Sequence, residues 1–240
     1  MSALLSMAGI SKRFRGLVAV DRVFCEVAKG EIFAVIGPNG AGKTTLFNMI
    51  ACALNSDEGT IVFRGERLDG LRPDEICRRG IARTFQIVRP FPALTVEDNV
   101  MVGALLRSAD TAHARTAAHD VLRRLDLFDK RQRPAKSLTL PDRKRLEVAR
   151  ALATAPQLLL LDEVMAGLRP TETDRMVAIL RDLNAQGLTI LLIEHVMRAV
   201  MALANRVLVL HHGAAIALGT PAEVTREPGV IESYLGTEAV

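Results

Sequence analysis

The chain has 240 residues, of which 49% are hydrophobic and 24% charged, and this composition excludes a disordered protein. Its length suits one large domain or two closely packed subdomains. No apolar run approaches the roughly 18 residues that a membrane helix needs, and residues 1–13 lack the pattern of a secretory signal. The net charge of +4 suits nucleic acid, anionic lipid or a phosphorylated ligand, but only 4% of residues are aromatic, which argues against a base-stacking surface. Cys25, Cys52 and Cys77 lack CxxC spacing, so we expect packing residues rather than disulfides or a zinc site.

Strand-like and helix-like hydrophobic patterns succeed one another along the chain. Roughly the first 30 residues, with a strand at residues 60–63, predict a small antiparallel sheet. Near-continuous apolar runs predict strands buried on both faces of a parallel sheet, at residues 32–36, 158–161, 189–193 and 207–210. Apolar residues at helical spacing predict helices at residues 44–54 and 171–183, and we expect residues 95–155 to be helical throughout, with Pro134 and Pro141 as interruptions. The alternation predicts an α/β core with a helical insertion.

The strongest signal for function is at residues 37–45, where the sequence Gly-Pro-Asn-Gly-Ala-Gly-Lys-Thr-Thr matches GxxxxGK[ST]. The motif follows the predicted strand 32–36 and opens the predicted helix 44–54, which is the context that it requires. Its glycines let successive backbone N–H groups point into one concavity and bind phosphate oxygens, and the helix N-terminus adds its positive end. Lys43 supplies a charge for the β- and γ-phosphates, and the Thr44 hydroxyl is placed to hold Mg²⁺.

The alternative for this segment is a glycine-rich turn without a ligand. Here, however, every fixed position of the motif and both flanking elements agree with phosphate binding. The predicted phosphate-binding residues are Gly37, Pro38, Asn39, Gly40, Ala41, Gly42, Lys43, Thr44 and Thr45.

Polar side chains also follow two other predicted strands. Asp162 and Glu163 come directly after the leucines of residues 158–161, at the strand end where open α/β sheets bind ligands. Asp162 suits a water-bridged partner of Mg²⁺, and Glu163 could polarise an attacking water; alone, such a pair is more often a helix cap or a solvated turn. His195 follows the strand 189–193 through Glu194. It could contact the γ-phosphate or the attacking water, or serve as a structural hydrogen-bonding group, and spacing does not decide between these roles.

With these residues, the chain resembles the ATP-binding subunits of ABC transporters over essentially its whole length. The resemblance implies an α/β fold of the P-loop NTPase type, with a RecA-like core, a small antiparallel β subdomain and a helical insertion. It implies a single ATP-binding domain of residues 1–240. The core and β subdomain would span about residues 1–86 and 156–240, and the helical subdomain about residues 87–155.

The resemblance also implies roles for individual residues, with ATP and Mg²⁺ as cofactors. Lys43, Glu163 and His195 would be catalytic, Glu163 as the base and His195 as the switch histidine. Gln86 would reach Mg²⁺ and lead into the helical subdomain. Phe14 lies where the family has an aromatic residue that stacks on adenine, although an isolated phenylalanine is more often a core residue.

Finer features are similar to the subunits that serve branched-chain amino acid importers. They lie at residues 82–86, 88–91, 94–100, 193–197 and 234–236. Subunits for urea or short amides share much of this pattern and are an alternative. So are a soluble ABC ATPase outside transport and an ATP-dependent regulator that scarcely hydrolyses ATP, although Glu163 counts against the regulator.

The family resemblance implies several partners. They are a second ATP-binding subunit, two transmembrane permease subunits and, indirectly, a substrate-binding protein, with no nucleic acid. The expected location is peripheral, at the cytoplasmic face of the plasma membrane. Residues Ile87, Val88, Pro90 and Phe91 are expected either to contact a membrane partner or to pack into the helical insertion. Residues 143–145 are expected to be a solvated helix face rather than a nucleic-acid surface.

One stretch departs from the family pattern. The signature Leu-Ser-Gly-Gly-Gln is expected before a helix at residues 143–153, but the matching residues here are Leu138, Thr139, Leu140, Pro141 and Asp142. The resemblance implies that this loop contacts the γ-phosphate held by the opposite subunit. Thr139 retains a hydroxyl, but Pro141 has no N–H, and one lost hydrogen bond to a charged group removes about 1.5–3 kcal/mol. We therefore hypothesise two unequal sites. The site that this loop completes is the weaker, and a sibling rather than a second copy is the favoured partner.

Overall fold

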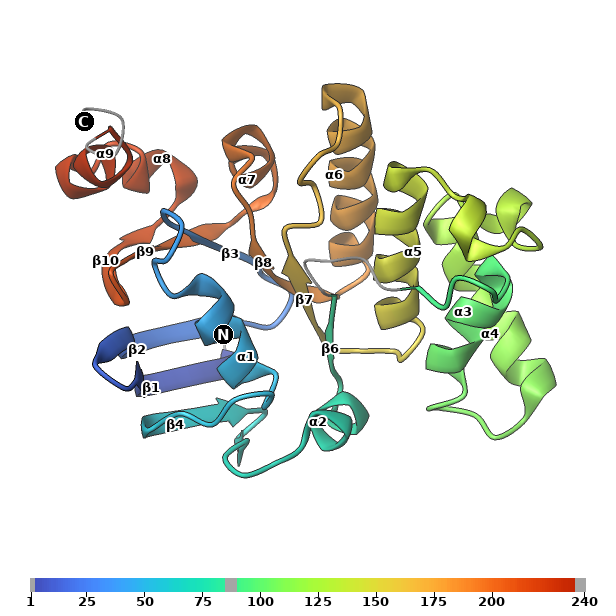
Figure 1. The fold of residues 1–240 in the computed structure, drawn as a ribbon, viewed down its shortest axis with the longest axis horizontal. Helices are drawn as coiled ribbons and strands as arrows, with labels where there is room; N and C mark the ends of the chain where they lie inside the picture. The colour runs from blue at the N-terminus through green and yellow to red at the C-terminus, as the bar shows by residue number, and fades with distance from the viewer. Residues whose placement is uncertain (1–2, 85–89, 236–240) are drawn as a thin grey trace.

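The structure is a computed structural model that describes residues 3–84 and 90–235, and it places helices around two β-sheets (Figure 1). The smaller sheet is antiparallel and has the strand order β2-β1-β4-β5. Its strands are β1 (Ala3–Phe14), β2 (Leu17–Ala28), β4 (Glu58–Phe63) and β5 (Glu66–Arg67). This confirms the antiparallel sheet expected from the N-terminal residues.

The larger sheet has the strand order β10-β9-β3-β8-β7-β6. Its strands are β3 (Ile32–Ile36), β6 (Ile81–Arg83), β7 (Leu158–Asp162), β8 (Thr189–Ile193), β9 (Arg206–His211) and β10 (Ala214–Gly219). All of its neighbouring strands pair in parallel except β10, which is antiparallel to β9. The carboxyl ends of the parallel strands therefore meet at one edge of the sheet, where ligands of such sheets bind.

The central strands β3, β7 and β8 are buried on both faces of the larger sheet, which explains why they are almost continuously apolar. Ile32, Ala34 and Ile36 pack into the core shared with the helices of the insertion. Phe33 and Val35, from the same strand, pack into a second core with the smaller sheet. This alternation follows from the two-residue repeat of a strand.

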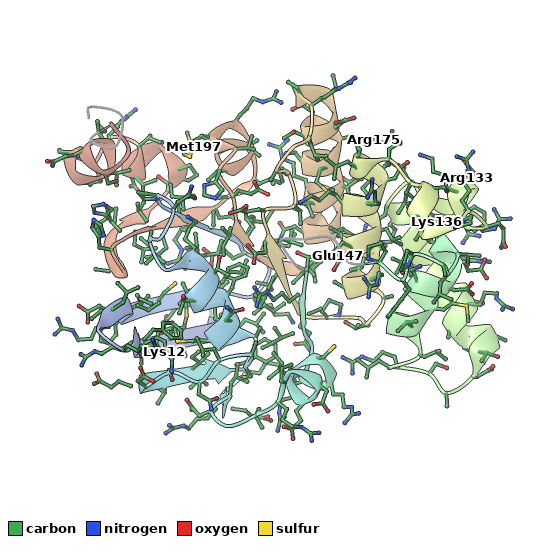
Figure 2. The ribbon with its side chains drawn as sticks, viewed as in Figure 1. Lys12, Arg133, Lys136, Glu147, Arg175 and Met197 are labelled. Atoms are coloured by element: carbon green, nitrogen blue, oxygen red, sulfur yellow. The ribbon has the colours of Figure 1, made fainter. Side chains whose placement is uncertain are left out.

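Helices surround the sheets, and α3, α4 and α5 gather at one end of the molecule, away from α8 and α9 (Figure 1). Figure 2 shows Arg133 and Lys136 on this helical end and Lys12 on the smaller sheet. The helices are α1 (Lys43–Ile50), α2 (Pro73–Arg79), α3 (Val96–Ala104), α4 (Thr111–Arg124), α5 (Leu140–Leu152), α6 (Pro170–Ala185), α7 (Met197–Leu203), α8 (Pro221–Val224) and α9 (Pro228–Leu235). Two 3₁₀ helices lie at Phe128–Lys130 and Ala135–Ser137.

Some expected helix boundaries are wrong. Residues 95–155 are not helical throughout, because irregular segments and the 3₁₀ turns separate α3, α4 and α5. Pro141 does not interrupt a helix: it lies in the first turn of α5, where a missing N–H removes no intrahelical hydrogen bond. The first helix ends at Ile50 rather than at Leu54, since Cys52 adopts a left-handed φ of 48° and the chain turns back.

Candidate nucleotide-binding site

The loop between β3 and α1 holds its curled shape because two glycines lie against neighbouring backbone. Gly37 has a φ of 150° and Gly42 a φ of 101°. A Cβ on Gly37 would lie 2.1 Å from the carbonyl oxygen of Leu210, and one on Gly42 would lie 2.2 Å from that of Ala19. Any side chain at either position would force the loop away from β9 or β2. Gly37 and Gly42 are therefore required by the packing as well as by the backbone conformation.

Lys43 is buried at the centre of this loop. Its Nζ donates to the carbonyl oxygens of Gly37 at 2.7 Å and Pro38 at 2.8 Å. Burial lowers the pKa of the ammonium, whereas the nearby charges of Glu163 and Asp162 act in the opposite direction. The loop thus holds the Lys43 ammonium against two of its own carbonyl oxygens, which phosphate oxygens can replace as hydrogen-bond acceptors.

Asp162 ends β7 within reach of the same cation and is 1% exposed. Its Oδ2 accepts a hydrogen bond from Arg83 at 3.0 Å, and Arg83 also donates to Asn48 on α1 at 2.6 Å. Among the described residues, Asp162 Oδ1 has no hydrogen-bond partner. Burial raises the pKa of Asp162 despite the Arg83 hydrogen bond. A buried carboxylate oxygen without a partner fits a divalent cation or a water bound to one.

Glu163 lies in the turn directly after β7, with a left-handed φ of 51°. Its Oε1 lies 2.6 Å from Nε2 of His195, which follows β8. The two predicted catalytic side chains therefore meet, although 31 residues separate them in the chain. The pairing follows from the parallel register, in which Asp162 lies opposite Ile193.

Sequence reasoning missed several residues around Glu163. Arg83 was not recognised as the partner of Asp162. Lys144 of α5 donates from Nζ to the carbonyl oxygen of Glu163 at 2.9 Å, and Glu194 accepts from the backbone N–H of Met165 at 2.9 Å. Glu194 directly follows a core strand, and this position could have marked it as a site residue. Lys144 lies on α5, and nothing in the sequence there indicates a contact with Glu163.

The charge of residues 143–145 predicted a solvated helix face, and this prediction is wrong for two of the three residues. Lys144 is 5% and Arg145 7% exposed. Arg145 pairs with Asp142 and Asp126, while Lys144 contacts Glu163. Only Arg143 is exposed. Charge alone could not distinguish these positions, because the packing of α5 against the turn after β7 decides it.

Phe14 and Gln86 are the two nucleotide contacts expected outside the loop and the strand ends. The Phe14 ring is 45% exposed at the end of β1, and Lys12 Nζ lies 5.7 Å from its centroid. Phe14 is thus a surface aromatic residue and not part of the core, as stacking on a base requires. Gln86 lies outside the described residues, as do Ile87 and Val88.

The signature-like loop closes on itself. Thr139 is the N-cap of α5, and its hydroxyl lies 3.5 Å from the backbone N of Asp142, which donates to it, and 3.0 Å from Asp142 Oδ2, to which it donates. Asp142 is also held by Lys130 at 2.5 Å and by Arg145. Burial acts to raise the pKa of Asp142, but the Lys130 and Thr139 hydrogen bonds and the nearby cations outweigh it and lower that pKa.

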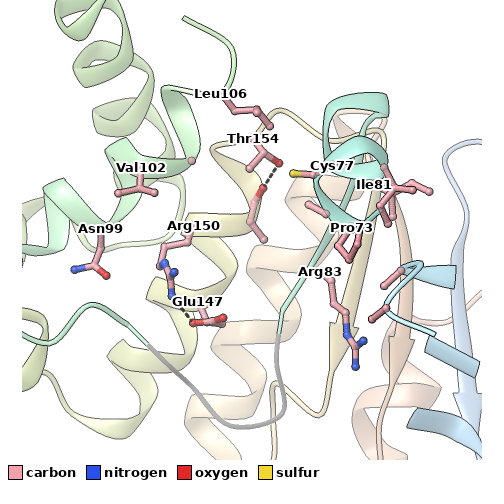
Figure 3. Close-up of a pocket in the computed structure, with 16 residues that line it drawn as sticks. Pro73, Cys77, Ile81, Arg83, Asn99, Val102, Leu106, Glu147, Arg150 and Thr154 are labelled. Atoms are coloured by element: carbon pink, nitrogen blue, oxygen red, sulfur yellow. Dashed lines mark hydrogen bonds and ion pairs between the residues drawn. The ribbon is translucent and has the colours of Figure 1, made fainter. Parts of the chain in front are cut away.

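A groove lies between α2, α3 and α5 (Figure 3). Its volume is about 490 Å³, and its walls come from α2, β6, α3 and α5. Most of the lining is apolar, including Ile76, Val102 and Leu106, and Glu147 and Arg150 pair on the α5 wall at 3.2 Å. Phe91 lies next to this wall with the Arg150 guanidinium 4.9 Å from its ring centroid. Phe91 therefore contacts the helical insertion and is still 43% exposed.

Comparison with known proteins places this geometry in a family. The protein-family model described as ABC transporter matches residues 20–166, more than half of the chain. The chain belongs to the ABC transporter family. As an ABC ATPase it binds and hydrolyses ATP, and this confirms the family, the fold and the nucleotide that the resemblance implied. A second model, described as Branched-chain amino acid ATP-binding cassette transporter, matches residues 216–240.

Individual relatives of this ABC cassette match over nearly their whole length. The chain is 41% identical to the high-affinity branched-chain amino acid transport ATP-binding protein LivG of Escherichia coli (strain K12), covering 97% of this chain and 98% of that protein. It is 37% identical to the corresponding protein BraF of Pseudomonas aeruginosa, with the same coverage. A solved ATP-binding cassette of an ABC transporter in its ADP conformation superposes with a TM-score of 0.90 at 31% identity, over 98% of this chain and 100% of that one. Among the described residues, every helix is too short or too polar to cross a membrane.

Proposed function

We propose that this cassette hydrolyses ATP to energise an importer of branched-chain amino acids. The observation that carries the proposal is the 41% identity to LivG along 97% of the chain, together with the C-terminal match at residues 216–240. The site geometry supports it, because the loop that holds Lys43, a buried carboxylate and the Glu163–His195 pair lie at one sheet edge. No observation favours urea or a short amide as the cargo.

The phosphate chain of ATP would lie in the loop 37–45, held by backbone N–H groups and by Lys43. Its phosphate oxygens would replace the carbonyls of Gly37 and Pro38 as acceptors for the Lys43 ammonium. Phe14 is exposed and would stack on the adenine. Mg²⁺ would be held by the Thr44 hydroxyl and Asp162, with Gln86 as a further ligand, and when bound it neutralises phosphate charge.

In hydrolysis, Glu163 would accept the proton of the attacking water. His195, 2.6 Å from Glu163, holds the carboxylate in place and would face the γ-phosphate from the neighbouring strand end. Such proton acceptance requires a base within hydrogen-bond reach of the water. The turn after β7 supplies this base, Glu163, at the edge of the sheet where Lys43 also lies.

The chain would form one ATP-binding domain with a helical subdomain at about residues 87–155. Support comes from the order of elements, because α3, α4 and α5 all lie between β6 and β7 and pack at one end of the molecule (Figure 1). Residues 1–86 and 156–240 would form the core and β subdomain. We place the protein peripherally at the cytoplasmic face of the plasma membrane, without nucleic acid as a partner.

The proposed assembly has two cassettes, two permease subunits and an external substrate-binding protein. The second cassette would be a different chain with a complete signature. In this chain Pro141 lacks an N–H, and the Thr139 hydroxyl already donates to the Asp142 carboxylate. The groove between α2, α3 and α5 is the proposed contact for a permease, since it is mainly apolar.

The test is substrate-dependent transport by the assembled complex. The chain is co-expressed with candidate permeases and a candidate second cassette, purified in detergent and reconstituted into vesicles. We expect uptake of labelled leucine that requires ATP and is lost in Lys43→Ala, with no uptake of labelled urea. ATP-dependent urea uptake without leucine uptake would refute the cargo. Co-purification with nucleic acid instead of membrane protein would refute a transport role.

A further inference from the structure

The backbone around Glu163 is held by side chains from two other elements. Glu163 has a φ of 51°, a region that residues with a side chain rarely adopt. Such a conformation persists only where the surroundings determine it. The turn after β7 therefore needs contacts that keep it in place, and those contacts decide where the Glu163 carboxylate points.

Backbone hydrogen bonds supply part of this support. Glu163 N–H donates to the carbonyl oxygen of Ile193 at 3.0 Å, and Ala166 N–H donates to that of Glu163 at 3.2 Å. The first bond joins the turn to the end of β8, and the second closes the turn. Neither bond reaches the N–H of Met165, which follows in the same turn.

Side chains supply the rest. Glu194 Oε1 accepts from the N–H of Met165 at 2.9 Å. Lys144 Nζ, on α5, donates to the carbonyl oxygen of Glu163 at 2.9 Å. One carboxylate and one ammonium thus hold successive peptide groups of the turn.

Glu194 is an unusual residue for a purely structural position. It is 1% exposed, and among the described residues its Oε2 has no hydrogen-bond partner. Glu163 and Lys144 are the ionisable side chains whose charges act on it. A buried polar atom without a partner destabilises a fold, so its retention calls for an explanation outside stability.

We propose that Glu194 is a positioning residue for ATP hydrolysis, which acts with Lys144 to fix the turn that carries Glu163. The inference rests on the proposed role of Glu163. It assigns Glu194 no contact with ATP or water, and only its hydrogen-bond acceptor is needed. An amide oxygen at this position satisfies the same requirement, whereas an apolar side chain does not.

The experiment compares Glu194→Leu with Glu194→Gln in the full-length chain assembled with its transporter partners. We expect Glu194→Leu to lower kcat by about 10- to 100-fold, since small misplacement of a reacting group has effects of this size, and to change the KM for ATP less than twofold. Glu194→Gln is expected to keep kcat within about threefold of the wild type. Lys144→Met leaves Glu194 in place and removes the hydrogen bond from α5 to the carbonyl oxygen of Glu163. We expect a lower kcat in this variant as well.

Glu31 provides a matched control. It is also buried, and its Oε2 accepts from the N–H of Ala28 at 2.7 Å, but it lies immediately before β3, at the sheet edge opposite the site. Glu31→Leu is expected to lower the melting temperature without changing kcat per folded molecule.

Two results would overturn the proposal. One is a wild-type kcat in folded Glu194→Leu or, if that variant does not fold, in Lys144→Met. The other is a Glu194→Gln variant as impaired as Glu194→Leu, because the carboxylate would then act other than as an acceptor. Glu163→Gln is measured in parallel. Wild-type turnover in that variant would refute the proposed role of Glu163, whereas inactive Glu163→Gln with active Glu194→Leu would refute only this inference.

Discussion

Two helices of this cassette begin after a loop at which phosphate binding is expected, and their N-termini are built in opposite ways. α1 has Gly42 as its N-cap and so no side-chain cap, and its first turn has no acidic residue. α5 has Thr139 as its N-cap, whose hydroxyl caps the helix, and its first turn contains Pro141 and Asp142. The α1 terminus therefore leaves its amides for an anion, whereas α5 uses its own side chains. Similar local architecture does not imply equal capacity to bind phosphate.

The largest effect is expected at the base associated with the α1 site. Glu163→Gln keeps the shape of the side chain but cannot accept a proton, so hydrolysis should fall by about 10²–10⁴-fold. ATP binding should persist, and in the complex the closed pair of cassettes should accumulate. Phosphate release and nucleotide binding measure the two effects. Undiminished turnover would show that Glu163 is not the base for hydrolysis. It would also contradict the contrast between the two helix termini.

The second-largest effect is expected on ATP affinity, at Lys43 in the loop 37–45. Lys43→Ala removes a charged donor from the phosphates, and ATP affinity should fall by about 10- to 100-fold, the equivalent of a charge-assisted hydrogen bond. Titration calorimetry with ATP measures it. Lys136→Ala is the control, because Lys136 is exposed on the helical end (Figure 2). Equal affinity in wild type and Lys43→Ala would contradict the role of the loop.

The α5 terminus can be tested by restoring its donors. Pro141→Gly returns an N–H, and adding Asp142→Gln removes the carboxylate that holds the Thr139 hydroxyl. We expect hydrolysis at the partner's nucleotide loop to rise, by up to about tenfold in the double variant. Steady-state ATPase of the assembled complex gives the rate, with Pro134→Gly as a control for loss of a proline outside the loop. A flat rate would end the hypothesis of unequal sites.

The smallest expected effect is on stability. The lowered pKa of Asp142 means that its charged form stabilises the fold above its ordinary pKa of 3.8, and that this contribution is lost as the pH falls through the lowered value. Asp142→Asn should therefore destabilise the protein by about 1 kcal/mol at pH 7. The difference should shrink in acid. Urea unfolding at several pH values checks this, and a pH-independent difference would show that the charge does not stabilise α5.

Much of the nucleotide-binding site at the N-terminus of α1 was predictable from sequence, because most of its functional residues lie within short segments of the chain. The loop 37–45 contains its donors in one segment, and Asp162 and Glu163 directly follow a strand of four leucines. The meeting of Glu163 with His195 needed only the parallel register of β7 and β8. The family resemblance then supplied roles that spacing leaves open.

What sequence could not provide depends on packing between distant elements. The burial of Lys144, its bond to Glu163 and the Arg83–Asp162 pair each join separate elements. Proline was misleading in α5, since Pro141 favours a first turn as readily as it interrupts a helix. The short β6 and α2 were not predicted, because three and seven residues carry too little periodicity.

The most direct test of the central claim is a crystal structure of the chain with Mg²⁺ and a non-hydrolysable ATP analogue. We expect the phosphates against the amides of residues 37–45, Lys43 Nζ moved from the Gly37 and Pro38 carbonyls onto phosphate oxygens, and Mg²⁺ beside Thr44 and Asp162. A nucleotide bound elsewhere, with this loop empty in a chain that still hydrolyses ATP, would contradict it.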